Sequence, residues 1–541
     1  MTRAAPQHPP VVGPRPVPAA SRRSLSRLRP ALPWLGPLGV VVLAAVLRLW
    51  NLGSPRSLVF DETYYVKDAF SLLQFGYEGQ WGESAGGEGA DAAFATGDTS
   101  SLSSDAAFIA HPPLGKWIIA LGVRVFAVDD PFGWRVSTAV VGVLAVALVC
   151  VLAFALFRSV ALATLAGGLL AIDGLAIVMS RTALLDNSLM LVTLAGFGAV
   201  LLDRRQSARR LDAWVASRVD RGLRIDWGPS LWWRPWLVAA GVLFGLATAV
   251  KWSGLYFLAV FAVYTLVVDA VARRRAGVAF WASSVVFRQA PVSFVLTVPT
   301  AAVAYVSTWA GWLLSSDAYG RGWADDEDAL GGAASDRPFA WLPNALESLW
   351  RYHVSMYNTN VGLETPHSYE ANPLTWFLLV RPTAFFYAGS SEGEGGCAAP
   401  TCSEYITSIA NPVLWWLLIV ALGYLVYRLA RYREWRVGLI LTGVAAGYLP
   451  WLLYLDRTVF QFYTIVFLPY LVLGATLVVK LLVDGARDAS GRIRWSSPPL
   501  VALGVALLLV VATSVFFWSA WSGISVSGTY QRWHYWLPTW R

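Results

Sequence analysis

Eleven runs of apolar residues constrain the fold of this chain more than any other feature. A helix needs about 20 mostly apolar residues to cross a bilayer, and it must be helical because lipid offers the backbone no hydrogen bonds. The runs predict spanning helices at residues 33–50, 136–157, 159–178, 184–202, 236–250, 253–272, 290–313, 411–428, 437–455, 460–482 and 499–519. Charged residues make up 14% of the chain, whereas a soluble domain carries about 25%. The predicted fold class is an all-α polytopic membrane protein, in which 159–202 can also be divided differently.

Basic residues set the predicted orientation, because Arg and Lys concentrate in cytoplasmic connections. Residues 1–32 are rich in Pro, Ala and Arg, which predicts a disordered basic cytoplasmic tail. With this tail inside, the connections that lie inside are also basic, and the C-terminus falls outside. Their basic stretches are 158, 204–224, 273–288, 428–436 and 480–494. The net charge of +8 then reflects topology and contact with anionic membrane lipid, which argues against a nucleic-acid partner.

The predicted organisation places one transmembrane domain, at 33–520, between the tail 1–32 and an outer C-terminal tail at 521–541. Two large outer loops interrupt the spans, at 51–135 and 314–410. In the first loop, residues 82–106 are rich in Gly, Ala and Ser, which predicts a flexible insert. Residues 114–128 form a shorter apolar run after two prolines, which predicts a helix lying at the membrane interface.

The second outer loop contains an acidic cluster and two cysteines. The run Asp-Asp-Glu-Asp at 325–328 predicts a solvated loop. A calcium site is the alternative, although the cluster lacks the Gly turn and terminal Glu of an EF-hand. Cys397 and Cys402 have no accompanying His or third Cys, so we expect a local disulfide rather than a metal site. Cys150 lies inside an apolar run and is expected to be a packed thiol.

The remaining unusual ionisable residues all fall on the predicted outer face. They are Arg48, Asp61, Glu62, His111, Lys116, Arg135, Arg181, Asp186, Lys251, Arg381, Asp456 and Arg457. Charges at a membrane edge cost about 2.5–3.5 kcal/mol on insertion scales and indicate function. Structural roles compete with this interpretation. Arg48 and Arg135 can snorkel to the interface, Asp186 can pair with Arg181 to fix a turn, and His111 can cap the interface helix.

Carboxylates that face several fixed cations are suited to one kind of reaction. Cations at the mouth of a helical bundle suit the phosphate or pyrophosphate of a membrane-anchored donor. A carboxylate among them can act as general base on an acceptor hydroxyl. The departing phosphate needs cationic stabilisation more than acid help. The pattern therefore indicates group transfer from a lipid-linked phosphate, and nothing in it requires a metal or another cofactor.

Six motifs in these regions resemble, in the same order, those of the protein O-mannosyltransferases, which are membrane glycosyltransferases of the GT-C type. They are FDETYY from Phe60, HPPLGK from His111, SRTALLDNSLM from Ser180, GLATAVKWSGL from Gly245, HSYEANPLTWFLLVRP from His367 and DRTVFQFYTIVFLPY from Asp456. The resemblance covers about residues 40–475. The second outer loop is too short for the β-trefoil MIR domain of fungal and animal members, which implies the bacterial, actinobacterial-type branch.

The resemblance implies roles for individual residues. The family's Asp-Glu pair falls on Asp61 and Glu62, which makes Asp61 the expected catalytic base. Glu62 is then expected to orient the acceptor or to support the site. The residues expected to bind the donor phosphate and the substrates are Arg48, His111, Lys116, Arg135, Arg181, Lys251, Trp252, Arg381 and Arg457.

The implied reaction is an inverting transfer of mannose from polyprenyl-phosphate mannose to Ser or Thr of a secreted protein, still extended as it leaves the secretion translocon. The expected place is the cell membrane, with the active site on the extracytoplasmic face. One alternative is another GT-C transferase, of the aminoarabinose type, with a glycolipid acceptor. The other is a transporter without chemistry. Transporters place charges near the midplane and often show inverted repeats, and the sequence shows neither feature.

Overall fold

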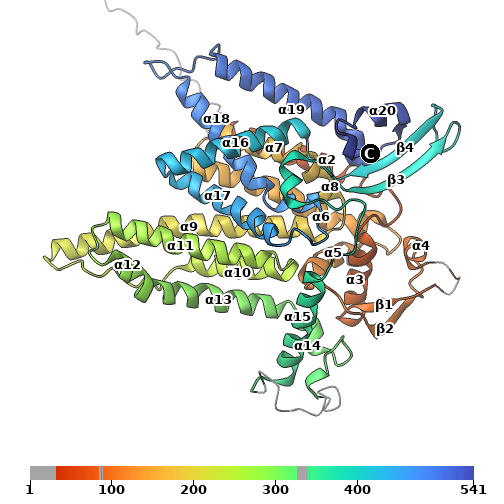
Figure 1. Cartoon of the computed structure of the whole chain (residues 1–541), viewed down its shortest axis with the longest axis horizontal. Coiled ribbons are helices and arrows are strands. Elements are labelled where there is room, and N and C mark those ends of the chain that lie inside the picture. The colour runs from red at the N-terminus through yellow and green to blue at the C-terminus, as the bar shows by residue number, and fades with distance from the viewer. Residues whose placement is uncertain (1–31, 85–86, 88, 326–338, 340) are drawn as a thin grey trace, which may run out of the picture.

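The computed structural model describes residues 32–541 except 85, 86, 88, 326–338 and 340. Most of the described helices lie side by side in one bundle (Figure 1). Eight are long and apolar enough to cross a membrane, and a ninth span results if α7 and α8, which meet at 62°, are taken as one broken helix. The predicted polytopic helical class is confirmed. The predicted tail lies outside the described residues, apart from Leu32.

The bundle contains every apolar run that the sequence predicted. Its helices are α2 (Leu35–Leu49, preceded by η1, Leu32–Trp34), α6 (Pro131–Phe157), α7 (Val160–Ala171), α8 (Gly174–Arg181), α9 (Leu185–Asp220), α10 (Pro235–Val250), α11 (Gly254–Arg275), α12 (Trp281–Ser284), η2 (Val285–Gln289), α13 (Ala290–Ser307), α16 (Pro412–Tyr432), α17 (Trp435–Tyr448), α18 (Leu468–Gly485) and α19 (Pro498–Ser522). The stretch α12–η2–α13 forms one candidate span, whereas α2 and α10 are shorter apolar helices.

One predicted boundary was wrong by several residues. The run 460–482 was expected to be one helix, but Gln461–Val466 forms the 3₁₀ turn η7, and α18 begins only at Leu468. Pro469 explains the new start, because proline lacks an amide hydrogen and fits best in the first turn of a helix. The difference matters because η7 carries aromatic residues of the candidate site.

The two large segments between spans gather at one end of the bundle (Figure 1). The first contains α3 (Glu62–Phe75), β1 (Gly79–Trp81), α4 (Ala90–Ala95), β2 (Leu102–Ala106) and α5 (Leu114–Val125). The second contains α14 (Ala310–Leu314), η3 (Trp323–Asp325), α15 (Asn344–Val361), η5 (Pro373–Leu378), β3 (Ala384–Ser391) and β4 (Thr401–Thr407). The C-terminal β5 (Val526–Ser527), α20 (Gly528–Trp533) and η8 (Pro538–Trp540) join them, and η6 (Leu449–Leu453) follows α17.

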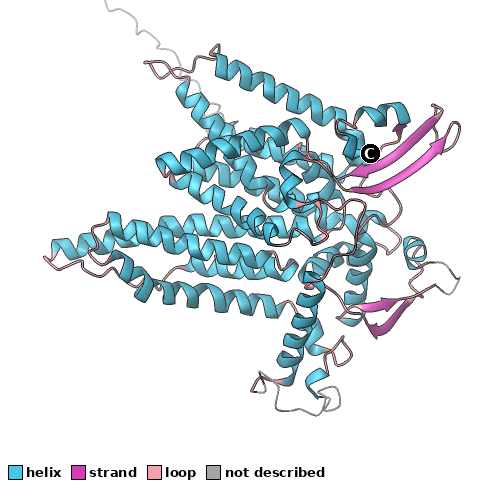
Figure 2. Ribbon diagram, viewed as in Figure 1, coloured by secondary structure: helices cyan, strands magenta, loops and turns pink. Residues whose placement is uncertain are grey.

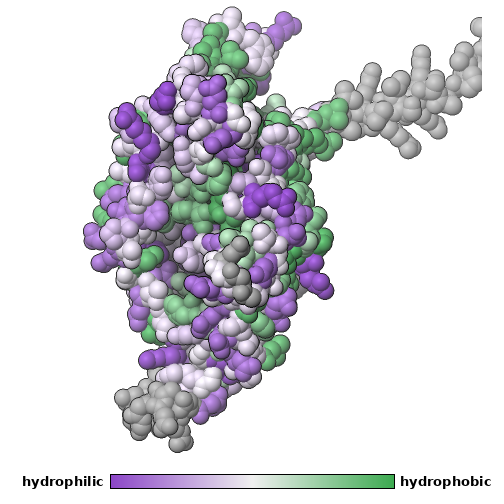
Figure 3. Space-filling model, turned by 90° about the vertical axis from the view of Figure 1, so that its right-hand side faces the viewer, coloured by the Kyte–Doolittle hydropathy of each residue, from purple (hydrophilic) through white to green (hydrophobic). Residues whose placement is uncertain are grey.

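The described strands all lie at this end (Figure 2), and the sequence did not predict them. β1 pairs with β2, and β3, β4 and β5 form a second antiparallel sheet. The insert 82–106 was predicted to be flexible, yet its described part folds against α3, where Lys67 lies 2.8 Å from Asp91. Of the acidic cluster, only Asp325 is described, at the end of η3. Seen from this end, the surface is largely hydrophilic, with apolar residues near its centre (Figure 3).

Close packing connects the two halves of the chain beneath this end. The side chain of Asp173 caps α8 by accepting from the amide of Ala176, at 3.0 Å, and it also accepts from the amide of Asn411, at 3.1 Å. A Cβ at Gly174 would lie 2.0 Å from the buried ring of Trp521. Only glycine permits that approach of α8 to α19, so the packing fixes where the α8–α9 turn lies relative to the C-terminal helices.

Candidate active site

Asp61 stands at the start of α3, where the backbone takes an unusual turn. Phe60 has a φ of 50°, a left-handed conformation that is rare for a bulky residue and common at functional sites. Asp61 is the N-cap residue, but its side chain does not cap the helix. An N-cap Asp ordinarily binds the amides of the first turn. The carboxylate of Asp61 is therefore left free for another partner.

An aromatic cluster holds the strained Phe60 in place. Its ring stacks on Phe385 of β3, with centroids 4.8 Å apart, and meets Phe460 and Phe462 edge-on at 5.6 Å. His367 closes the cluster at 6.1 Å. Residues from three distant parts of the chain thus surround one side chain. Their packing energy opposes the backbone strain and sets the position of the neighbouring Asp61.

Glu62 has an entirely different environment from Asp61. Its buried carboxylate accepts two hydrogen bonds of 2.8 Å from Arg135, one from Nε and one from Nη2. It also accepts from the amides of Val59, at 3.0 Å, and Ala183, at 2.9 Å. Four donors leave the carboxylate little capacity for a substrate. Glu62 and Arg135 therefore tie the start of α3 to α6 and to the α8–α9 turn.

The pKa of Asp61 suits a general base. Burial raises it from 3.8 to about 6, the nearby Lys251 lowers it, and the negative charge of Asp186 raises it. Lys251 is only 5% exposed. Its ammonium lies 3.0 and 3.1 Å from the two oxygens of Asp186 and 4.0 Å from the ring centroid of Tyr463. At neutral pH Asp61 is an ionised carboxylate held beside a fixed cation.

A small polar cavity of about 90 Å³ adjoins this group. Among its lining residues are His111, Lys251, Trp252, Asn360 and Arg457. Burial and the nearby cations hold the pKa of His111 well below its usual value, so the imidazole is neutral. Arg457 donates to the side chain of Asn360, at 3.1 Å, while its Nε is buried without a partner. The cavity therefore offers cationic donors to an anion of the size of a phosphate.

A long apolar groove continues from this cavity. Its volume is about 690 Å³, and it shares Trp252, Tyr256, Tyr357 and Tyr454 with the polar cavity. Side chains of α10, α11, α13 and α15 line the rest, with Ala301 and Ala302 among them. Trp252 donates to the hydroxyl of Tyr305, at 3.1 Å. An anionic group in the cavity could therefore carry an apolar chain lying in the groove.

Other residues that the sequence singled out have protein partners instead. Arg48 donates to Ser180 and to carbonyl groups of α2 and α7. Arg181 donates to carbonyl groups that include that of Trp50, at 2.6 Å. Lys116 pairs with Glu78 and lies 3.7 Å from Asp68. Arg381 binds the carbonyl groups of Ser368 and Thr539. These cations organise the site without reaching its cavity.

One predicted partner was wrong. Asp186 was expected to pair with Arg181, five residues before it, but it binds Lys251. Arg181 ends α8 and points toward the carbonyl groups at the end of α2, whereas Asp186 begins α9 after the turn. Tyr65 was not among the predicted site residues, although its ring centroid lies 6.3 Å from that of His111. Tyr463 was not predicted either, although both tyrosines lie within the motifs FDETYY and DRTVFQFYTIVFLPY.

Neither cysteines nor acids form a metal site within the described chain. No group of three His, Cys, Asp or Glu side chains there is placed to hold an ion. Cys397 and Cys402 form a disulfide between the end of the β3–β4 connection and the start of β4. Cys150 is a buried free thiol.

Comparison with known proteins gives this site its context. A family described as "Dolichyl-phosphate-mannose-protein mannosyltransferase" matches residues 102–217, and one described as "C-terminal four TMM region of protein-O-mannosyltransferase" matches 345–540. A protein of Mycobacterium tuberculosis named polyprenol-phosphate-mannose–protein mannosyltransferase is 33% identical over 98% of this chain and 96% of its own length. A protein of the same name from Mycolicibacterium smegmatis is 32% identical over 94% and 93%.

The fold agrees with these matches. The S. cerevisiae Pmt1–Pmt2 protein O-mannosyltransferase complex, solved with its sugar donor, contains a chain that superposes with a TM-score of 0.64. That alignment covers 94% of this chain and 92% of the yeast chain at 13% identity. The matched families together cover more than half of the chain, and the mycobacterial relatives align over nearly all of it. The chain therefore belongs to the protein O-mannosyltransferase family of GT-C membrane glycosyltransferases.

Proposed function

We propose that this chain transfers mannose from polyprenyl-phosphate mannose to the hydroxyl of Ser or Thr in a protein. The observation that carries this proposal is that Lys251 connects the three features of the site. Its charge acts on the uncapped carboxylate of Asp61, and it lines the cationic cavity with Arg457, which shares lining residues with the apolar groove. The names of the mycobacterial relatives state the same donor and a protein acceptor.

The donor fits the site in one orientation. Its polyprenyl chain lies in the groove along α10, α11 and α13, and its phosphate occupies the polar cavity. Lys251 and Arg457 then contact the phosphate oxygens, with His111 as a neutral neighbour. Fixed cations in a dry cavity stabilise developing negative charge strongly, because they need not reorganise during the reaction. These side chains supply the positive charge, so the proposal includes no metal or other cofactor.

The proposed reaction is a single displacement. The acceptor oxygen attacks C1 of mannose from the side opposite the phosphate, and its proton passes to Asp61. The bond between C1 and the phosphate oxygen breaks, and its electrons leave with polyprenyl phosphate. The configuration at C1 is inverted. A carboxylate with a pKa of about 6 is a weak base toward a hydroxyl, so proton transfer is concerted with departure of the phosphate.

The proposal places the reaction at the extracytoplasmic face of the cell membrane. The two large segments, the first of which contains Asp61, lie at one end of the bundle, and the arginine-rich end of α9 lies at the other (Figure 1). Basic residues favour the cytoplasmic side. Acceptors would then be secreted polypeptides, met in an extended form as they leave the translocon. A glycolipid acceptor, as in aminoarabinose transferases, is the second candidate, and the relatives' names favour protein.

The test supplies both substrates to the purified chain in lipid nanodiscs. Polyprenyl-phosphate [¹⁴C]mannose is incubated with a Ser/Thr-rich peptide and with a matched peptide in which Ala replaces every Ser and Thr. We expect label on the first peptide alone, and we expect EDTA to leave its rate unchanged. Label that stays in lipid with both peptides would contradict the proposal. A parallel sample of Asp61→Asn distinguishes enzymatic transfer from a contaminant.

A further inference from the structure

A second cavity lies far from the candidate active site. Its volume is about 450 Å³, and it is lined by the C-terminal parts of α9 and α11 and by the connection between α16 and α17. The distance between the two sites can be estimated along α9, because Asp186 beside the active site and Arg204 in the second cavity both lie on this helix. Eighteen residues at about 1.5 Å each separate them by about 27 Å. This approaches the thickness of a bilayer core, about 30 Å, so the cavity faces the opposite leaflet.

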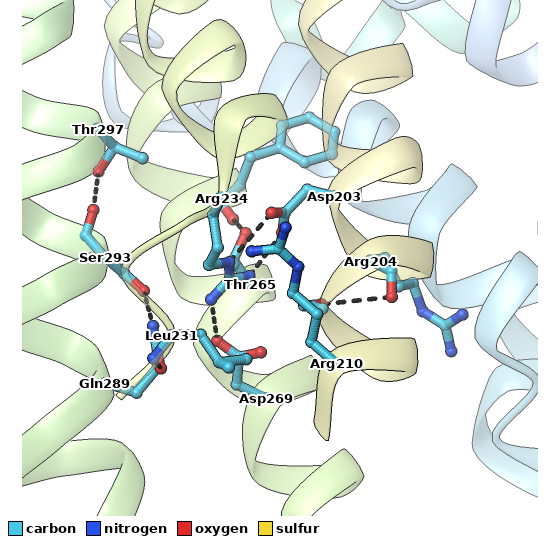
Figure 4. Close-up of polar contacts among 12 residues, drawn as sticks. Asp203, Arg204, Arg210, Leu231, Arg234, Thr265, Asp269, Gln289, Ser293 and Thr297 are labelled. Atoms are coloured by element: carbon cyan, nitrogen blue, oxygen red, sulfur yellow. Dashed lines mark hydrogen bonds and ion pairs between the residues drawn. The ribbon is translucent and has the colours of Figure 1, made fainter. Parts of the chain in front are cut away.

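One wall of this cavity is a buried ion network (Figure 4). Arg234 donates to Asp203, at 3.0 and 2.5 Å, and to Asp269, at 2.6 Å. Arg273 completes the network, with Nη1 4.0 Å from Asp269 and Nη2 2.9 Å from Gln289. Two arginines balance two aspartates, so the wall is rigid and carries no net charge.

The opposite side of the cavity carries uncompensated positive charge. Arg204, Arg275 and Arg433 line it, and none of them forms an ion pair with a described residue. Arg204 points away from Asp203 in Figure 4 and lies 4.0 Å from the ring centroid of Trp435. It also faces the repulsion of Arg275. Like charges gathered around a cavity favour an anion there.

Buried polar atoms at the same place lack partners. The Arg204 guanidinium and the Tyr264 hydroxyl lie close enough to interact as a hydrogen-bonding pair, but the Nε of Arg204 and the hydroxyl of Tyr264 are both buried without a hydrogen bond of good geometry. Buried donors without partners are uncommon and costly, at about 1–3 kcal/mol each. Both residues line the cavity. A ligand with acceptor oxygens would satisfy them.

The charge of the cavity indicates how anionic this ligand is. The acids that line it are Asp212, Asp269 and Glu434. Asp269 belongs to the neutral network, and Glu434 pairs with Arg428. Arg204, Arg275, Arg433 and Asp212 remain, so the cavity lining carries a net charge of two positive. This excess suits a phosphate group, which presents several acceptor oxygens to guanidinium donors.

The rim of the cavity is apolar and faces outward from the bundle. Val267 and Val271 of α11 are 55% and 43% exposed, and both line the cavity beside Leu429 and Gly438. Exposed valines on a candidate spanning helix are typical of contact with lipid chains. The ligand therefore needs an anionic head for the arginines and an apolar chain for the valines.

We propose that this cavity binds the phosphate of an anionic glycerophospholipid from the leaflet opposite the active site. The headgroup phosphate lies among Arg204, Arg275 and Arg433 and accepts from Tyr264. The acyl chains lie along Val267 and Val271. The bound lipid bridges α9 and α11 to the connection between α16 and α17, and so joins the two halves of the bundle at this end. The site is separate from the donor groove and does not depend on the proposed transfer reaction.

The test measures thermal unfolding of the full chain in three kinds of nanodisc. They contain phosphatidylcholine alone, phosphatidylcholine with 20% phosphatidylglycerol, or phosphatidylcholine with inorganic phosphate in the buffer. We expect phosphatidylglycerol alone to raise the melting temperature. Native mass spectrometry should show one phosphatidylglycerol retained per chain. Each arginine near a lipid surface contributes about fivefold in affinity, so Arg204→Ala with Arg433→Asn should weaken retention about 25-fold.

The matched control is Arg209→Ala with Arg431→Ala. It removes the same number of charges from α9 and from the C-terminal end of α16, at exposed positions that do not line the cavity, and it should keep the lipid. Equal loss in both double variants would overturn the proposal in favour of a diffuse surface charge. A shift produced by inorganic phosphate would overturn the assignment to lipid. If the double variant unfolds, Arg433→Asn alone gives the same comparison, because that side chain is exposed.

Discussion

The carboxylate of Glu62 binds Arg135 through two hydrogen bonds of 2.8 Å, while the adjacent carboxylate of Asp61 leaves its own helix uncapped. Two acidic residues that are neighbours in sequence are thus separated in role by their partners. Glu62 is saturated with donors from α6, the loop before α3 and the α8–α9 turn. Asp61 is held beside Lys251 and Asp186 and is available to a substrate.

Replacing Glu62 with Gln should destabilise the protein more than it alters the chemistry. The change leaves Arg135 buried without its counter-charge, and breaking a buried ion pair costs about 3–5 kcal/mol. Thermal unfolding in nanodiscs should show a lower melting temperature. Arg135→Met with Glu62→Gln should recover part of this loss. If Glu62→Gln melts like the unchanged chain but loses turnover, Glu62 acts on a substrate instead.

Asp61→Asn should remove most turnover while the donor still binds. The amide keeps the shape of the side chain but cannot accept the proton, and a general base contributes about 10²- to 10⁴-fold. Transfer of labelled mannose to peptide measures turnover, and retention of polyprenyl-phosphate mannose measures binding. Full activity in Asp61→Asn would remove this residue as the base without changing the family assignment.

The rate should fall as the pH falls through about 6. Burial raises the pKa of Asp61 to about 6, so the ionised fraction is about one half at pH 6 and about one tenth at pH 5. Burial and the nearby cations hold the pKa of His111 well below its usual value, so we attribute the fall in rate to Asp61. The pH profile of transfer tests this, and a flat profile from pH 5 to 7 would contradict it.

The same pKa shift predicts a slope in stability. The folded pKa of about 6 exceeds the ordinary 3.8, so the folded state binds the Asp61 proton more tightly than the unfolded state. Stability contributed by Asp61 should therefore decrease as the pH rises from about 4 to 6, and stay constant above that range. Asp61→Asn should flatten this part of the melting-temperature profile.

Lys251→Ala should weaken donor binding more than it alters the chemical step. The ammonium lines the polar cavity, and a hydrogen bond to a charged group contributes about 1.5–3 kcal/mol, or roughly 10- to 150-fold in affinity. The single change also leaves Asp186 buried and unpaired. Lys251→Ala with Asp186→Asn restores charge balance, so it should recover folding but not donor affinity. Recovery of both would assign Lys251 a purely structural role.

Filling the apolar groove should discriminate against long donors. Ala302 lies on α13, lines the groove and is exposed to it, so Ala302→Trp would occupy space that a polyprenyl chain needs. We expect a raised KM for a long-chain donor and little change for a short-chain donor. Val303→Trp, next to it on the same helix but absent from the groove lining, is the control. Equal effects on both donors would place the lipid chain elsewhere.

The sequence alone determined the class and the order of the parts. Apolar runs near 20 residues long admit few structures in lipid, because every backbone group must be satisfied within its own helix. The runs therefore predicted the bundle helices, with errors confined to boundaries such as that of α18. Six ordered motifs identified the family, and they included Asp61, Lys251 and Arg457, which the fold brings to one place.

Only the tertiary structure decided which of the unusual charges face the site. Asp186 binds Lys251, 65 residues away, rather than Arg181, five residues away. Arg48 and Arg181 donate hydrogen bonds to backbone carbonyl groups at the ends of helices. A charged side chain reaches whatever partner the packed backbone places within about 3 Å, and that depends on crossing angles and turns that no local pattern records. Helix formation is local in this chain, whereas the pairing of buried charges is a property of the whole bundle.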